Sequence, residues 1–585
     1  MRKLTLSLSR ALACASLLVA GGALLNVKAQ TPDPGAAGPL AVTREEYDYG
    51  PLAFQPPGFP SAVELKASVH YPTGLPGGPY PLVVFMHGRH VTCYRNTTAT
   101  LRWPCRSNET VIPSYQGYDY VAQNLASNGY IVVSVSANGI NAYDNNVTDL
   151  GMLARAQLIQ RHLQQWNTFN TASTAPFGTK FVGKVNLTRV GTMGHSRGGE
   201  GVVRHYAHNL SLGSPYGVKA VFPLAPVNFN RTIANNVPLS VALPYCDGDV
   251  NDNQGVHFYD DARYNVAADA APKHTIQVMG ANHNFFNTVW TPGLFPAGTA
   301  DDWTAFTSGG TGDAQCGTVS GNHRLTAAQQ RGVGLAYISA VMRAYVGGES
   351  QFIPYLTGVA APPPSAQTTE IHVSYHAPAA VRRDVNRLLT SANLTTNTLG
   401  GASAQTGLTP HDLCGGASPQ PQHCLPATQS TARQPHTTVS ARATTVRGLS
   451  QLRTGWSATT ANYRNDLPTG SRDVSGFSWV TFRVSVNFAD TRNPSGIGQN
   501  FSVVLTDGTG ATSSVTVASY SDVLFYPPGS VGPVPKVLLN TARIPVSAFS
   551  GVNLSDIRSV QFKFDQSPSG ALLISDVAFA SPPVP

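Results

Sequence analysis

The chain has 585 residues, of which 42% are hydrophobic and only 12% are charged, about half the charged share of an average soluble protein. This length predicts more than one domain; the 55 Gly and 43 Pro, dispersed without a three-residue period, exclude a collagen-like protein, and the many large apolar residues exclude wholesale disorder. The net charge of +8 falls to about +4 without the four basic residues among the first 29, and no Lys/Arg stripe interleaved with aromatics is present, so nucleic acid is not an expected partner.

The N-terminus has the layout of a secretory signal peptide. Three basic residues among the first ten precede an apolar stretch from Ala11 to Leu25, and Val27-Lys28-Ala29 ends it with small residues at the spacing of a cleavage site. We therefore expect a signal peptide over residues 1–29 and a secreted, extracellular protein, with a lipoprotein anchored at Cys14 as the alternative. No later stretch reaches the roughly 18 apolar residues of a membrane span, so no stable membrane insertion is expected.

Six cysteines remain after Cys14, and an even number in an exported chain favours disulfide bonds. Cys93–Cys105 and Cys414–Cys424 are the favoured pairs because each closes a short polar loop. Cys246–Cys316 is then left by subtraction. Zinc is the rival interpretation, but the chain has no C-x-x-C pair.

From about residue 40 to 346, strand-like and helix-like patterns alternate. The continuous apolar run 82–86 predicts a strand buried on both faces, and the strand-like and helix-like segments that follow predict further strands and helices, one of which is a helix from Thr326 to Val346. The predicted strands are 82–86, 131–135, 189–193, 218–222, 239–243 and 275–279, and the other predicted helices are 117–127, 150–166 and 200–209. Repeated β-then-α order predicts a mostly parallel sheet covered by helices on both faces, over residues 30–350.

The pattern changes after this region. Residues 351–368, which include three consecutive prolines, are expected to be a linker. Residues 369–585 show strict alternation, as in Trp479–Phe488, with turn residues between the alternating segments. This arrangement predicts an all-β sandwich as a second domain. The region loosely resembles jelly-roll modules of the galactose-binding or carbohydrate-binding type.

One motif stands out in the first region. Gly194-His195-Ser196-Arg197-Gly198 lies between a predicted strand and a predicted helix and has the form G-x-S-x-G. A serine on such a tight strand-to-helix turn is exposed as a nucleophile, and the first N–H groups of the helix point at developing negative charge. Ser196 is therefore the candidate nucleophile.

A serine hydroxyl needs a base, and the base needs a carboxylate that fixes its tautomer. His283 follows a predicted strand late in the chain, in the loop Gly280–Phe286. Asp247 and Asp249 both follow the strand that ends at Leu243, and Asp247 is favoured because its distance from the strand end is the usual one. The order Ser, Asp, His along the chain differs from that of chymotrypsin-like and subtilisin-like enzymes.

The oxyanion hole of such a site needs two backbone N–H donors. One is expected from Arg197, directly after the nucleophile, and the other from Arg89, in the loop after the strand 82–86. The loop after Asp247 also permits a calcium site, because Asp249, Asn251, Asn253 and Asp260 occupy the first, third, fifth and twelfth positions of an EF-hand-like spacing. The expected glycine is displaced by one residue there, and neither a metal nor an organic cofactor is expected.

These motifs resemble those of secreted α/β-hydrolases, in the esterase-like group that includes chlorophyllases, platelet-activating-factor acetylhydrolases and bacterial polyester hydrolases. The resemblance rests on FMHGRH (85–90), LASNGYIVVSVSANG (125–139), GHSRGG (194–199), CDGDV (246–250) and GANHNFF (280–286). It implies an α/β-hydrolase fold over residues 30–350, with Ser196, Asp247 and His283 as a triad. The insertion around Cys93–Cys105 and the extended loop Asn251–Asp260 after the candidate acid depart from the group, so the substrate is not carried over.

The sequence therefore predicts a serine hydrolase that cleaves carboxylic esters, an esterase, lipase or polyester hydrolase, through an acyl-enzyme. The alternatives are a serine peptidase on the same fold and a non-catalytic binding protein. The expected partner is an ester substrate, which can be a polymer or surface bound by a carbohydrate-binding-like C-terminal domain, and the protein is expected to be a monomer.

Overall fold

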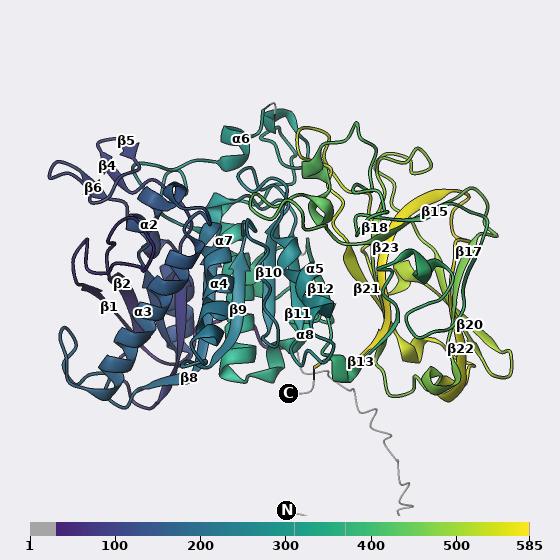
Figure 1. The fold of residues 1–585 in the computed structure, drawn as a ribbon, viewed down its shortest axis with the longest axis horizontal. Coiled ribbons are helices and arrows are strands. Elements are labelled where there is room, and N and C mark those ends of the chain that lie inside the picture. The colour runs from purple at the N-terminus through teal and green to yellow at the C-terminus, as the bar shows by residue number, and fades with distance from the viewer. Residues whose placement is uncertain (1–30, 309, 369, 584–585) are drawn as a thin grey trace, which may run out of the picture.

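The computed structural model describes residues 31–583 except residues 309 and 369, and the signal peptide predicted for residues 1–29 lies outside this range. Figure 1 shows two parts side by side: a sheet flanked by helices, and an all-β part formed by the C-terminal third of the chain. No helix within the described residues is long and apolar enough to cross a membrane.

The first part is built on a nine-stranded sheet with the order β1-β2-β7-β3-β8-β9-β10-β11-β12. The strands from β7 to β11 are parallel, whereas β1, β2 and β12 join the two edges antiparallel. The strands are β1 (Val42–Asp48), β2 (Lys66–Pro72), β3 (Tyr80–Met86), β7 (Ile131–Val135), β8 (Val185–His195), β9 (Val218–Leu224), β10 (Leu239–Pro244), β11 (Lys273–Val278) and β12 (Ile371–His376).

Helices cover both faces of this sheet. Alternate residues of β3 belong to different core clusters: Leu82 and Val84 lie with α3, α4 and α5, and Val83 and Phe85 lie with α1 and α7. The helices are α1 (Asp119–Ser127), α2 (Asn138–Tyr143), α3 (Met152–Thr171), α4 (Arg197–Ser211), α5 (Val256–Asn265), α6 (Asp302–Phe306), α7 (Ala327–Val341) and α8 (Ile353–Leu356). The predicted α/β-hydrolase architecture is confirmed, and the capping box of Thr326 and Gln329 starts the last long helix where the sequence placed it.

A small sheet is inserted after β3. It consists of β4 (Cys93–Arg95), β5 (Thr98–Thr100) and β6 (Thr110–Val111), and the disulfide Cys93–Cys105 closes it. The other two predicted disulfides, Cys246–Cys316 and Cys414–Cys424, are also present.

The C-terminal part is a sandwich of two antiparallel sheets around one apolar core. One sheet has the order β15-β16-β23-β18-β21, with β13 also paired to β23, and the other has the order β14-β17-β22-β19-β20. The strands are β13 (Arg382–Asn386), β14 (Ser403–Thr406), β15 (Leu408–Cys414), β16 (Gln451–Trp456), β17 (Asn462–Asp466), β18 (Trp479–Val486), β19 (Ser502–Asp507), β20 (Thr512–Thr516), β21 (Asn540–Pro545), β22 (Ile557–Lys563) and β23 (Gly570–Ala580).

The boundary between the two parts differs from the sequence-based expectation. Residues 351–368, expected as a linker, bury Phe352, Tyr355 and Leu356 in the core beside α7. The next strand, β12, pairs with β11 and so completes the hydrolase sheet, whereas residues from 369 onward were expected in the sandwich. Because residues 351–368 pack beside α7, the alternating segment that directly follows them lies next to the edge strand β11, and pairing there covers the open edge of the sheet.

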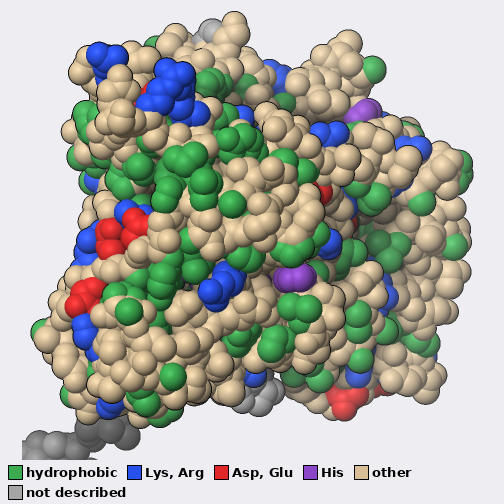
Figure 2. Space-filling model, turned by 60° about the vertical axis from the view of Figure 1, so that its left-hand side comes forward, with side chains coloured by type: hydrophobic (Ala, Val, Ile, Leu, Met, Phe, Trp, Pro, Cys, Tyr) green, Lys and Arg blue, Asp and Glu red, His purple; other side chains and the backbone are tan. Residues whose placement is uncertain are grey.

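Charged side chains are sparse on one face of the molecule. On the face shown in Figure 2, Lys, Arg, Asp and Glu are scattered among hydrophobic and uncharged side chains. This agrees with the charged share of 12% in the whole sequence.

Candidate active site

Ser196 lies at the sharp turn between β8 and α4. Its backbone has φ 58° and ψ −124°, a strained conformation for a non-glycine residue, and its side chain is nearly buried, with 4% of the residue exposed. Such a turn places the hydroxyl at the carboxyl edge of the parallel strands and the N-terminus of α4 directly behind it. Its Oγ has no hydrogen-bond partner among the described residues.

The glycines of the motif are required by close packing around this turn. A Cβ on Gly194 would lie 2.0 Å from the carbonyl oxygen of Gly198, and a Cβ on Gly198 would lie 2.5 Å from that of Met86. Gly88, in the loop after β3, approaches so closely that its Cβ would lie 2.5 Å from the Cβ of Ser196. The loop after β3 and the serine turn are therefore in direct contact.

His283 and Asp247 are brought together by the loops after two neighbouring strands, β11 and β10. Nδ1 of His283 donates to Oδ2 of Asp247 at 2.8 Å, and both side chains are buried. The second oxygen of Asp247 accepts from the backbone N–H groups of Asp249, at 3.0 Å, and Val250, at 2.6 Å. The carboxylate is thus fixed on both oxygens and holds the imidazole in one tautomer.

His283 packs against His195, the residue that precedes Ser196, and therefore lies beside the turn that carries the candidate nucleophile. The ring centroids of His195 and His283 are 4.8 Å apart, and the ring of Trp290 lies 4.7 Å from that of His195. Burial lowers the pKa of His195 well below its ordinary value, so its ring is neutral. The predicted Ser196, Asp247 and His283 therefore gather at one edge of the sheet; their catalytic roles stay a prediction.

Asp249, the competing acid, lies on the other side of His283. Its Oδ2 is 3.7 Å from Nε2 of His283, and its side chain is 51% exposed. Nε2 is the nitrogen that would have to face the serine, so a carboxylate there cannot fill the orienting role that Asp247 fills at Nδ1. The geometry favours Asp247 over Asp249 as the acid.

A second buried carboxylate, Asp302, supports the histidine backbone. It accepts from the N–H groups of His283 and Asn284, each at 2.9 Å, and of Gly248 at 2.8 Å. Burial, together with the charge of Asp247, raises the pKa of Asp302 to about 7. This residue was missed from the sequence, because it begins the short helix α6 without a motif around it, 19 residues after His283 and 54 after Gly248, and only the fold brings it to both loops.

The electrostatics of His283 are set by these acids. Burial lowers the pKa of His283, but the charge of Asp247 and their hydrogen bond outweigh burial and raise the pKa to about 9. The charges of Asp249 and Asp302 act in the same direction.

The expected oxyanion donors are also neighbours in space. Arg197 is the first residue of α4, and Arg89 follows Gly88, which touches Ser196. The side chains of both arginines pair with Asp144, a fully buried carboxylate that also binds the buried Arg155. An ion pair of Arg197 with Glu200 along the helix is not formed, because Glu200 instead accepts from the N–H groups of Phe229 and Asn230.

The calcium alternative does not fit the structure. Asp260 lies in α5 with its carboxylate bound to His436 and Arg483 of the sandwich, and the side chain of Asn253 is bound to Pro244 and Lys536. No cluster of three or more His, Cys, Asp or Glu side chains suited to a metal occurs in the described part of the chain.

Comparison with known proteins bears on the same region. Residues 104–292 match the model of the PETase family, described as PET hydrolase-like, and this range contains Ser196, Asp247 and His283. No curated protein matches the chain. The fold, with its mostly parallel sheet and flanking helices, agrees with the family match. The first part of the chain thus has an α/β-hydrolase fold, is similar to PET hydrolase-like proteins over residues 104–292, and is joined to a C-terminal β-sandwich.

Proposed function

We propose that the protein is a secreted serine hydrolase that cleaves carboxylic esters, in a polyester or in smaller molecules, with Ser196 as nucleophile, His283 as base and Asp247 as orienting acid. The observation that carries the proposal is the hydrogen bond between His283 and Asp247 beside the strained turn of Ser196. The match of residues 104–292 to PET hydrolase-like proteins supports an ester as the substrate.

The reaction follows from the roles of these groups. His283 removes the proton of Ser196 Oγ as the oxygen attacks the ester carbonyl, and the backbone N–H groups of Arg89 and Arg197 hold the oxyanion. The C–O bond to the alcohol breaks as His283 returns the proton to the leaving oxygen. Water, activated by the same imidazole, then cleaves the acyl-enzyme and regenerates Ser196. Asp247 stabilises the imidazolium in both halves of the reaction.

Secretion and attachment are further parts of the proposal. Three disulfide bonds favour an oxidising, extracellular compartment. We infer that the sandwich contacts a polymer or surface and that the protein acts as a monomer. Of the aromatic residues of the sandwich that could stack on a bound polymer, Tyr520 is 48% exposed, whereas Trp456 is buried against Phe564.

The direct test is Ser196→Ala, assayed on a short-chain chromogenic ester. We expect hydrolysis and covalent labelling by a fluorophosphonate to be lost, while Ser211→Ala, an exposed serine at the other end of α4, retains both. Undiminished turnover by Ser196→Ala would reject the assignment. Matched ester and amide substrates distinguish an esterase from the peptidase alternative, because one triad serves both bond types.

A further inference from the structure

Residues 244–253, which carry Asp247 and are called the acid loop here, are bound by a segment of the β-sandwich. The sandwich segment 527–539, called the docking loop here, runs toward β21 and reaches the end of β10. Its Lys536 is 1% exposed, and the ammonium group donates to the carbonyl oxygen of Tyr245, at 2.9 Å, and to Oδ1 of Asn253, at 2.8 Å. These two acceptors lie before and after Asp247 in the chain.

A hydrogen bond inside the acid loop completes the contacts of Lys536 around Asp247. Nδ2 of Asn253 donates back to the carbonyl oxygen of Pro244, at 2.8 Å, so Lys536 and Asn253 together tie the two ends of the acid loop. The backbone N–H of Lys536 also donates to the Tyr245 hydroxyl, which in turn donates to the carbonyl oxygen of Pro528. The backbone on both sides of Asp247 is thereby fixed to the sandwich rather than to the hydrolase core alone.

The ammonium group of Lys536 also brings a positive charge near the carboxylate of Asp247. Within the described residues no carboxylate lies within ion-pair distance of its ammonium, although a buried charge without a counter-ion is costly. Burial lowers the pKa of Lys536 to about 8, and the charges of Asp247, Asp252 and Asp302 oppose this effect. The cation is therefore balanced by the acids around the acid loop, two of which contact His283 directly.

The docking loop is anchored well enough to hold this position. Asp313 accepts from the N–H groups of Ser530, at 2.7 Å, and Val531, at 3.1 Å, in the same hydrolase loop that carries Cys316, the disulfide partner of Cys246. Val534 and Leu538 belong to the apolar core of the hydrolase domain, beside Tyr245 and Cys246.

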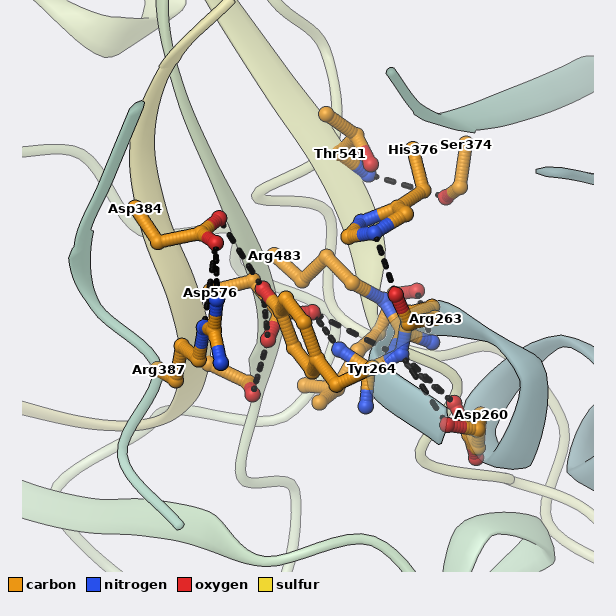
Figure 3. A network of polar contacts seen from close by, with 12 residues as sticks. Asp260, Arg263, Tyr264, Ser374, His376, Asp384, Arg387, Arg483, Thr541 and Asp576 are labelled. Carbon is orange, nitrogen blue, oxygen red and sulfur yellow. Dashed lines mark hydrogen bonds and ion pairs between the residues drawn. The ribbon is translucent and has the colours of Figure 1, made fainter. Parts of the chain in front are cut away.

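A second group of contacts fixes the helix that follows the acid loop. Figure 3 shows Asp260 and Arg263 of α5 meeting Arg483 and Asp576 of the sandwich. Asp260 is 2.8 Å from Arg483, and His436 donates to it at 2.7 Å. Because His436 and Arg483 outweigh the effect of burial, the pKa of Asp260 lies well below its ordinary value, and this carboxylate stays charged. The sandwich thus holds the acid loop at Lys536 and its following helix at Arg483.

We propose that Lys536 of the β-sandwich is a positioning residue for the catalytic acid, so that the sandwich is a structural component of the active site and not only an attachment module. The proposal rests on the proposed function, because it gives Lys536 a role through Asp247. The loop geometry and the buried cation both point to the same consequence: without Lys536, Asp247 orients His283 less well.

The test is Lys536→Met in the full chain, which removes the charge and the donors while keeping an unbranched side chain. Assays on the chromogenic ester run from about pH 6 to about pH 10, so that they span the acid limb set by His283, whose pKa is about 9, and include the range below about 8 in which Lys536 is charged. We expect kcat to fall by up to about 100-fold with KM nearly unchanged, since misplacement of a catalytic group acts on the chemical step. The acid limb of the pH profile moves to higher pH, because loss of the nearby cation favours the protonated imidazole of His283.

The matched control is Lys563→Met, a half-exposed lysine of β22 in the same sandwich, which should leave kcat and the pH profile unchanged. If Lys536→Met does not fold, Asn253→Gly serves instead: its backbone φ of 47° suits glycine, and it removes both the acceptor of Lys536 and the donor to the carbonyl oxygen of Pro244. Asn253→Gly is then expected to lower kcat without changing KM. A folded variant with the kcat of the wild type overturns the proposal.

The outcomes for Lys536 and for the proposed function are separable. If Ser196→Ala abolishes hydrolysis while Lys536→Met changes neither kcat nor the acid limb, only the role of Lys536 is rejected. If Ser196→Ala is fully active, the proposed function itself fails, whatever Lys536→Met does.

Discussion

The side chains of Arg89, in the loop after β3, and Arg197, the first residue of α4, form ion pairs with the same carboxylate, that of Asp144. Nε of Arg89 is 3.1 Å from one oxygen of Asp144, and Nη1 of Arg197 is 2.8 Å from the other, which Arg155 also contacts at 3.0 Å. The two residues whose backbone N–H groups are the expected oxyanion donors are therefore tied to each other through one buried anion. Asp144 fixes the distance between two chain segments that must act together.

Replacing Asp144 by Asn should strongly destabilise the protein. The substitution leaves the fully buried guanidinium of Arg155 without its anion, and breaking a buried ion pair costs about 3–5 kcal/mol. Urea unfolding followed by circular dichroism measures this loss. Asp466→Asn, which breaks a pair with Arg464 on the surface, is the control and should cost at most about 1 kcal/mol. Equal losses in the two variants would contradict the role assigned to Asp144.

The parts of the site that follow strand ends could be predicted from the sequence. The turn of Ser196, the loop of His283 and the loop of Asp247 each come after a segment that the alternation of strand-like and helix-like patterns predicts as a strand, and parallel strands bring their carboxyl ends to one edge. Local patterns also predicted the sandwich, because Val480, Phe482 and Val484 alternate into one core. In both cases, the signal lies within a few neighbouring residues.

The parts of the site that depend on contacts between distant segments could not be predicted from the sequence. Asp144 and Lys536 have no local pattern, and each owes its role to partners from other segments of the fold, in the case of Lys536 about 280 residues away in the chain. Strand β12 was assigned to the wrong side of the boundary for a related reason: an alternating segment fits either an antiparallel edge strand or a sandwich strand. Only the packing of residues 351–368 decides between them.

Gly88→Ala should impair catalysis without unfolding the protein. Its Cβ would lie 2.5 Å from the Cβ of Ser196 and 2.7 Å from the carbonyl oxygen of His195, so the serine turn or the oxyanion loop must shift. A displacement of this size can lower kcat/KM by about 100-fold. Steady-state kinetics on the chromogenic ester measure the effect, with Gly476→Ala, where a Cβ meets open space, as the control. Full activity of Gly88→Ala would show that this loop does not act beside Ser196.

The disulfide Cys246–Cys316 should matter for both stability and activity. It closes a separation of 70 residues, and its loss, by replacing both cysteines with Ala, is expected to cost about 4 kcal/mol. Since Cys246 directly precedes Asp247, kcat should fall as well. The matched variant without Cys414–Cys424, a separation of 10 residues in the sandwich, should lose about 3 kcal/mol but keep its kcat. Thermal unfolding and ester hydrolysis below both melting temperatures separate the two effects.

The acids around His283 predict the pH dependence. The base must be neutral to accept the proton of Ser196, and its pKa is raised to about 9, so kcat/KM should rise with pH up to about 9. Asp249→Asn removes a carboxylate 3.7 Å from Nε2, which lowers the pKa of His283 and moves the acid limb to lower pH while activity persists. Asp247→Asn should instead lower kcat by about 10⁴-fold, because the imidazole loses its orienting acid. The reverse ranking of the two variants in pH–rate profiles would assign the acid to Asp249.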